Sequence, residues 1–208
     1  MHVRAIGVCG RACDTRRMPL DLPPALAIHD WPLPYEAKLA PRDAAAVDLV
    51  VIHCTELPDM AMTREFGERV HYPATGTGNS GHYYIERDGT IYRYVADTRV
   101  ANHTFGYNPR SIGIELSNIG RYPHWGDSRY QAFTQPYTRE QIDALLALLK
   151  QLRNTLPNLR YIAGHEDLDR RLEPATDDPS IMLHRRQDPG PLFPWEKIVP
   201  ASGLERLK

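Results

Sequence analysis

The stretch VVIHCTE, residues 50–56, ends an apolar run that begins at Val47 and is interrupted only by Asp48. A short and nearly continuous apolar run is typical of a strand that is buried on both faces of a sheet. This run stops at His53, and a further apolar run, LRYIAGH at residues 159–165, also ends at a histidine, His165. The sequence therefore predicts two buried strands that each carry an imidazole at the carboxyl end.

The segments around these runs alternate between strand and helix patterns. The stretch HYYIERDGTIYRYVA, residues 82–96, has an Asp-Gly turn signal between β-branched and aromatic residues and predicts a hairpin. SIGIEL, residues 111–116, alternates in period two and predicts a strand. We expect a helix over residues 62–70 and a second one that begins after Thr138, where Gln141 completes a capping box. This order predicts an α/β fold, with a single mixed β-sheet and helices packed against it.

The flanks of this region have a different composition. Residues 1–45 are rich in proline and lack periodicity, so we expect an irregular N-terminal arm that lies on the domain. Residues 46–200 are expected to form the folded domain, and residues 201–208 a C-terminal tail.

Composition excludes several classes of partner. The 208 residues carry a formal net charge of -1, which provides no electrostatic footprint for nucleic acid or an anionic membrane. No apolar run reaches the roughly 18 to 20 residues of a membrane span. The N-terminus lacks the apolar core of a signal peptide, and three cysteines do not make a disulfide framework. We therefore expect a cytoplasmic protein, or a periplasmic or secreted one if a leader has been removed.

The two strand-end histidines suggest a metal site. Ligands in α/β sheets gather at the carboxyl ends of strands, so neighbouring strands would bring His53 and His165 together. A hydrolytic zinc site uses three protein ligands and an open position for water, so one carboxylate would complete it. The downstream carboxylates are Asp167, Asp169, Asp177, Asp178 and Asp188. Spacing alone does not choose among them, and two ordinary hydrogen-bonded histidines remain the alternative interpretation.

Five strings in order narrow this choice. They are VVIHCTE, SGHYYIERDGTIYRYV, VANHTFGYNPRSIGIEL, AGHEDLD and RRQDPGPLFPW. Together they closely resemble the zinc-dependent, AmpD-like N-acetylmuramoyl-L-alanine amidases, which are related to the peptidoglycan recognition proteins. The resemblance extends over about residues 47–197.

The resemblance implies a role for particular residues. It implies one zinc ion per chain, held by His53, His165 and Asp188, and it implies that Glu115 is the catalytic carboxylate. The family normally has a lysine where this chain has Arg186. Arginine keeps the positive charge that stabilises an oxyanion, but it is a far poorer proton donor. A polar insert between His165 and Asp188 lengthens the connection to the third ligand.

Three further residues near the proposed site are His103, Asn108 and Cys54. His103 and Asn108 match the segment that lines the substrate groove in relatives, and a structural hydrogen bond is the alternative for His103. Cys54 follows a proposed ligand, and adjacent strand residues face opposite ways, so we expect a buried, inert thiol rather than a nucleophile.

The resemblance also implies an activity. The expected reaction is hydrolysis of the amide between the lactyl group of muramic acid and L-alanine, in peptidoglycan or muropeptides. The alternative is a module that binds peptidoglycan fragments without cutting them, and the arginine at position 186 is the feature that favours it.

Overall fold

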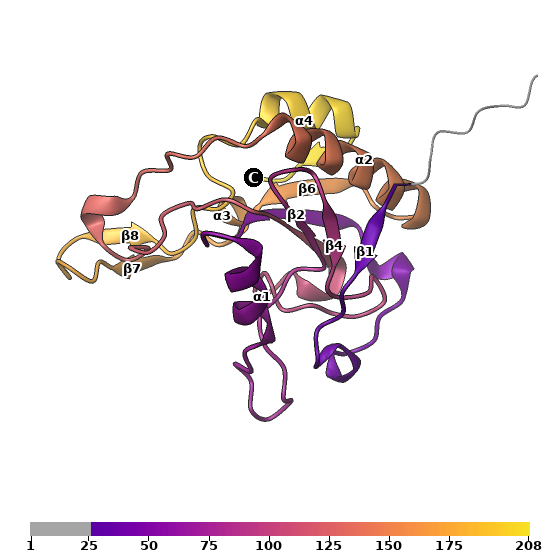
Figure 1. Cartoon of the computed structure of the whole chain (residues 1–208), viewed down its shortest axis with the longest axis horizontal. Coiled ribbons are helices and arrows are strands. Elements are labelled where there is room, and N and C mark those ends of the chain that lie inside the picture. The colour runs from indigo at the N-terminus through magenta and orange to yellow at the C-terminus, as the bar shows by residue number, and fades with distance from the viewer. Residues whose placement is uncertain (1–25) are drawn as a thin grey trace, which may run out of the picture.

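The computed structural model describes residues 26–208 (Figure 1). The first 25 residues of the expected arm, with Cys9 and Cys13, lie outside the described part. The main sheet contains β1 (Ile28–Asp30), β2 (Leu49–Cys54), β3 (Tyr83–Ile85), β4 (Ile91–Arg93), β5 (Ser111–Leu116), β6 (Tyr161–Gly164) and β9 (Glu205–Arg206). A separate hairpin consists of β7 (Leu172–Pro174) and β8 (Met182–His184). The α-helices are α1 (Met60–Glu68), α2 (Arg139–Thr155), α3 (His165–Leu168) and α4 (Trp195–Ser202), and the 3-10 turns are Glu36–Lys38, Ala44–Ala46, Asn108–Arg110 and Ser128–Tyr130.

The seven strands lie in the order β1-β4-β3-β5-β2-β6-β9. Only the β3–β4 pair is antiparallel, and every other neighbouring pair in this sheet is parallel. All six residues of β2 are buried, as expected for a central strand with neighbours on both sides. The predicted single mixed sheet is therefore confirmed, and SIGIEL forms β5 with the predicted bounds.

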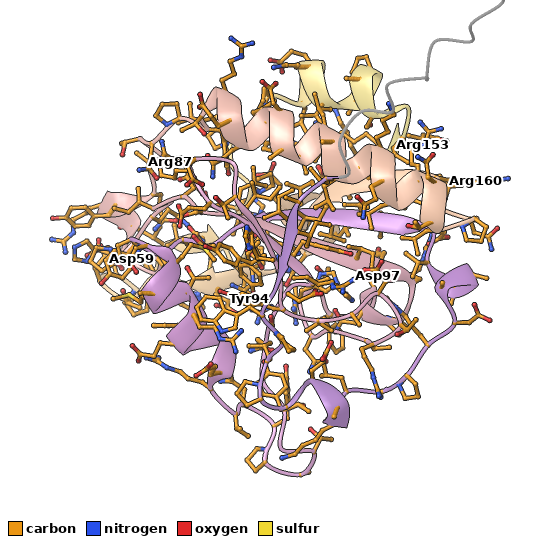
Figure 2. All side chains as sticks on the ribbon, turned by 45° about the vertical axis from the view of Figure 1, so that its right-hand side comes forward. Asp59, Arg87, Tyr94, Asp97, Arg153 and Arg160 are labelled. Carbon is orange, nitrogen blue, oxygen red and sulfur yellow. The ribbon has the colours of Figure 1, made fainter. Side chains whose placement is uncertain are left out.

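Helices cover one face of the sheet, and a second apolar cluster covers the other. In Figure 1, α2 and α4 lie together above the sheet and α1 lies below it. Helix α2 begins at the predicted capping box, in which the Thr138 hydroxyl accepts from the Gln141 backbone N–H. Leucines of α2 pack on β2 and β5, whereas Tyr84 stacks on Tyr94, labelled in Figure 2, on the opposite face. Adjacent residues of a strand face opposite ways, so Tyr83 and Tyr84 belong to different clusters.

Several elements differ from the sequence-based expectation. Strand β1 pairs with β4 within the segment expected to be irregular, and β9 pairs with β6 within the expected tail. Both strands have three residues or fewer, which is too short to show a period. The division at residues 45 and 200 stays a prediction, although the sheet extends across both positions. No helix within residues 26–208 is both long enough and apolar enough to cross a bilayer.

Candidate metal centre and its cavity

Two strand-end histidines meet because their strands are neighbours. Strands β2 and β6 run parallel with Ile52 opposite Gly164, so the residues that follow, His53 and His165, lie side by side. Their rings are 4.6 Å apart between centroids. Asp188 reaches both from the loop after β8, with its Oδ2 2.9 Å from His53 Nδ1 and 3.2 Å from His165 Nδ1. All three side chains are buried, and one ligand atom from each lies within 4.8 Å of the others.

The protonation states of this cluster suit a cation. Burial lowers the pKa of His53 to about 4, against the opposing effect of its contact with Asp188. Burial alone would raise the pKa of Asp188, but its interactions with His165 and His53 outweigh that effect and hold the pKa well below its usual value. At neutral pH the cluster thus presents a carboxylate and a neutral imidazole. Zinc binds these forms of the side chains, so the residues present fit a zinc ion.

Glu115 lies beside the cluster on the adjacent strand. It is opposite His53 in the register of β2 and β5, and its Oε1 is 4.0 Å from His53 Nδ1. The side chain is 16% exposed and lines the same cavity. Burial raises its pKa well above the usual value, the charge of Asp188 adds to this, and the charge of Arg186 opposes it. Glu115 thus faces a cavity in the structure, as its position in the strand predicted.

Arg186 also faces this cavity. Its Nε is buried and has no hydrogen-bond partner among residues 26–208. Its positive charge opposes the rise in the pKa of Glu115 that burial causes, and it adds to the lowering of the pKa of His53 by burial. A buried donor without a partner is costly, so this guanidinium is available to an acceptor that enters the cavity.

His103 and Asn108 border the cavity, but their hydrogen bonds are internal. Asn108 Oδ1 accepts from the backbone N–H groups of His103 and Thr104, at 3.1 and 2.7 Å. The His103 ring lies behind His53, 3.1 Å from His53 Nε2 to its own Nδ1. These contacts favour the structural alternative for His103, and substrate binding by either residue stays a prediction.

Cys54 is buried, and burial raises the pKa of its thiol well above the usual value. A thiol in this state is a poor nucleophile at neutral pH. The structure therefore agrees with an inert Cys54.

The three proposed ligands, His53, His165 and Asp188, line a cavity of about 730 Å³ that has two walls. One wall comes from the end of α1 and the loop after it, and it includes Phe66, His71, Tyr72 and Asn79. The facing wall comes from the loop around Trp125 and from the β7–β8 hairpin, and it includes Thr176, Leu183 and His184. The hairpin is the insert noted in the sequence between His165 and Asp188.

The family profile described as "N-acetylmuramoyl-L-alanine amidase" matches residues 43–191. This range includes the cluster and both walls of the cavity. The chain belongs to this amidase family. The predicted family is thus confirmed.

Two curated relatives are amidases of the same kind. N-acetylmuramoyl-L-alanine amidase AmiD of Escherichia coli strain K12 is 34% identical over 92 residues, which cover 44% of this chain and 28% of AmiD. The 1,6-anhydro-N-acetylmuramyl-L-alanine amidase AmpD of Enterobacter cloacae is 29% identical over 123 residues, covering 55% of this chain and 52% of AmpD. The chain therefore matches about half the length of these relatives or less.

Solved structures share the fold. The endolysin amidase LysCS from Clostridium intestinale superimposes with a TM-score of 0.61 at 22% identity, covering 86% of this chain and 97% of that one. Peptidoglycan recognition protein LE, solved with tracheal cytotoxin, superimposes with a TM-score of 0.53 at 18% identity, covering 80% and 86%. The predicted relation of the fold to peptidoglycan recognition proteins is confirmed.

In this amidase-family chain a buried ion pair supports the wall that contains Trp125. Arg121 donates to both carboxylate oxygens of Glu56 at 2.7 Å, and the two side chains are only 2% and 9% exposed. The Trp125 indole N–H donates to the Glu56 carbonyl oxygen. Arg121 also contacts Gln131, which in turn contacts Gln187 next to the metal cluster. This network could not be predicted from the sequence, because single charged residues in loops have no periodic pattern.

Acidic residues attach the hairpin to the rest of this wall. Asp169 accepts from Arg171 and Arg185, which flank the hairpin on either side, at 2.7 Å each. Asp177, between β7 and β8, accepts from the backbone N–H and the hydroxyl of Ser128, which lies in the loop after Trp125. The hairpin is therefore fixed at its base and near its turn.

Proposed function

We propose that this protein hydrolyses the amide between the lactyl group of N-acetylmuramic acid and L-alanine in peptidoglycan fragments, with zinc as cofactor. The observation that carries the proposal is the convergence of His53, His165 and Asp188 beside Glu115 at the base of a cavity. Membership of the amidase family and the names of its curated relatives support the choice of bond.

One zinc ion would be held by His53 Nδ1, His165 Nδ1 and an oxygen of Asp188. Two imidazoles and one carboxylate form a ligand set that catalytic zinc uses, with a position left for solvent or substrate. When bound there, the ion supplies Lewis acidity, which polarises the scissile carbonyl and lowers the pKa of water.

Glu115 acts as the general base. It takes the proton of the attacking water, whose oxygen forms a bond to the lactyl carbonyl carbon. Because burial raises its pKa, the protonated carboxyl can pass the proton to the departing L-alanine nitrogen as the C–N bond breaks. One residue thus moves one proton from water to the leaving amine.

Arg186 stabilises the negative charge that develops on the carbonyl oxygen. Its buried Nε, which has no hydrogen-bond partner within residues 26–208, and its positive charge suit that task. Guanidinium does not give up its proton, so Arg186 takes no part in proton transfer.

The substrate occupies the cavity between the two walls, with its scissile amide at Glu115. Peptidoglycan fragments or muropeptides are the proposed partners, and the polar side chains of the α1 wall are available to a stem peptide. The cytoplasmic location stays a prediction, which cell fractionation tests.

The experiment is mass spectrometry of an anhydro-muramyl tripeptide incubated with the protein, with chelator and then with added zinc. The expected result is release of free tripeptide that chelator abolishes and zinc restores. His53→Ala serves as the matched inactive variant. If zinc-loaded, folded protein cuts neither this substrate nor a longer wall fragment, the hydrolase proposal is wrong and a binding module takes its place.

A further inference from the structure

We propose that His103 and Ser111 position His53, by fixing which of its ring nitrogens carries the hydrogen, and thereby set the affinity of the metal site. This inference rests on the proposed zinc site and assigns a role to residues behind it. His103 is a positioning residue here, because its ring nitrogens contact His53, Ser111 and Thr104 and it acts on the metal site through His53.

The Ser111 hydroxyl determines which nitrogen of His103 carries the ring hydrogen. Ser111 donates its hydroxyl hydrogen to the Tyr107 carbonyl oxygen at 2.8 Å, an acceptor that cannot donate. The oxygen of Ser111 also lies 3.2 Å from His103 Nε2. Because its hydrogen is already in use, Ser111 accepts in this second contact. The hydrogen of the His103 ring therefore resides on Nε2.

The ring of His103 is in direct contact with the ring of His53. A neutral imidazole carries one ring hydrogen, so His103 Nδ1 is an acceptor. This atom lies 3.1 Å from His53 Nε2, and the rings meet edge to face. His53 Nε2 is then the donor in this contact. The Thr104 hydroxyl lies 3.0 Å from the same His103 Nδ1 and 3.4 Å from His53 Nε2, so it can donate to the first nitrogen and accept from the second, which is consistent with a hydrogen on His53 Nε2.

Asp188 lies at the other ring nitrogen of His53. With its hydrogen on Nε2, the ring presents a bare lone pair on Nδ1, only 2.9 Å from Asp188 Oδ2. Two acceptors at this distance repel each other unless a cation lies between or beside them. His103 therefore selects the form of His53 in which Nδ1 is available to a metal. Metal-bound histidines generally donate their other ring N–H to such a partner, which fixes the ring.

The surroundings of His103 hold it in place for this task. Asn108 fixes the backbone of the loop that carries it. The ring lies against Gly113, where an added Cβ would come within 2.6 Å of His103 Cγ. Asn108 and Gly113 thus support the metal site indirectly, through His103.

The test measures zinc affinity and the ring hydrogen separately from hydrolysis. Zinc dissociation constants are measured by competition with a chromogenic chelator for wild type, His103→Ala, His103→Gln and Ser111→Ala. Loss of such a supporting contact weakens metal binding about 10- to 100-fold, so this loss is expected for His103→Ala. His103→Gln should recover most of it, since the amide oxygen can accept from His53. His124→Ala, at an exposed histidine whose ring lies tilted against that of Tyr130, is the matched control and should bind zinc normally.

Long-range proton–nitrogen NMR correlation on metal-free protein reads the ring hydrogen directly. Wild-type His53 should carry it on Nε2, and His103→Ala should show a mixture. The inference is overturned if wild-type His53 carries the hydrogen on Nδ1, or if folded His103→Ala binds zinc as tightly as wild type. Failure of wild type to bind zinc at all would instead overturn the proposed function.

Discussion

Gly113→Ala should destabilise this protein although it adds a single methyl group. The new Cβ would lie 2.6, 2.7 and 3.0 Å from His103 Cγ, Nδ1 and Cδ2, all closer than side chains normally approach. The ring cannot easily move away, because His53 and Ser111 contact its two nitrogens. Either the ring or strand β5 has to shift.

The expected cost follows from three contributions. Overpacking of this kind costs about 1–3 kcal/mol. A weakened buried hydrogen bond to His53 adds about 1 kcal/mol. Replacement of glycine by alanine restricts the unfolded chain and returns about 0.4–1 kcal/mol. The net loss is about 1–3 kcal/mol, which shifts the urea midpoint by about 1 M when m is about 2 kcal/mol/M.

Urea unfolding of metal-free protein is the assay, and Gly67→Ala is the control. Gly67 lies in α1, and its added Cβ would meet only Leu33 Cδ2, at an ordinary 3.6 Å. This variant should be stabilised by up to about 1 kcal/mol, because glycine is a poor helix former. A Gly113→Ala variant that unfolds at the same urea concentration as wild type or at a higher one, with an unchanged slope, would contradict the expected clash. Added zinc should also stabilise Gly113→Ala less than wild type, because the stabilisation that a ligand provides grows with its affinity for the folded state.

Three further predictions concern other parts of the molecule. Glu115→Gln should lower the rate of amide hydrolysis about 10²- to 10⁴-fold and leave zinc binding intact, and a rate near wild type would remove Glu115 as the base. Glu56→Gln should cost about 3–5 kcal/mol in urea unfolding, because it leaves the buried guanidinium of Arg121 without its carboxylate, and a loss below about 1 kcal/mol would contradict this. Hydrogen bonds from Arg171 and Arg185 lower the pKa of Asp169 in the folded state. These contacts therefore stabilise the folded protein at pH values above the pKa that the Asp169 carboxyl has in the unfolded chain, and the stabilisation is lost as the pH falls. Asp169→Asn should therefore be less stable than wild type at pH 7, with a gap that narrows below about pH 4, and a constant gap would argue against this ion pairing.

The sequence predicted the sheet and part of the site because those features depend on local pattern. Apolar runs that end at His53 and His165 indicated two buried strands, and parallel pairing of such strands brings their ends together. Asp188 could not be chosen from spacing, since its loop crosses an insert of unknown shape. The resemblance to the amidase family selected it, and the structure places it between the two histidines.

Features that depend on non-local contacts were not predicted. Glu56 and Arg121 are 65 residues apart and form a buried pair that neither residue's surroundings in the sequence suggest. His103 was expected in the substrate groove, and its proposed positioning role depends on the orientation of Ser111 and of the His53 ring. Such orientations follow from the folded backbone and not from residue type.

The two short edge strands have a consequence for how this protein is handled in the laboratory. Strands β1 and β9 cover opposite edges of the sheet, and both lie outside the family segment 43–191. A protein trimmed to that segment would leave β4 and β6 with open rows of backbone donors and acceptors. Exposed edges of this kind recruit strands from other molecules. Such a trimmed version should therefore aggregate during expression, even though it would still contain every proposed zinc ligand.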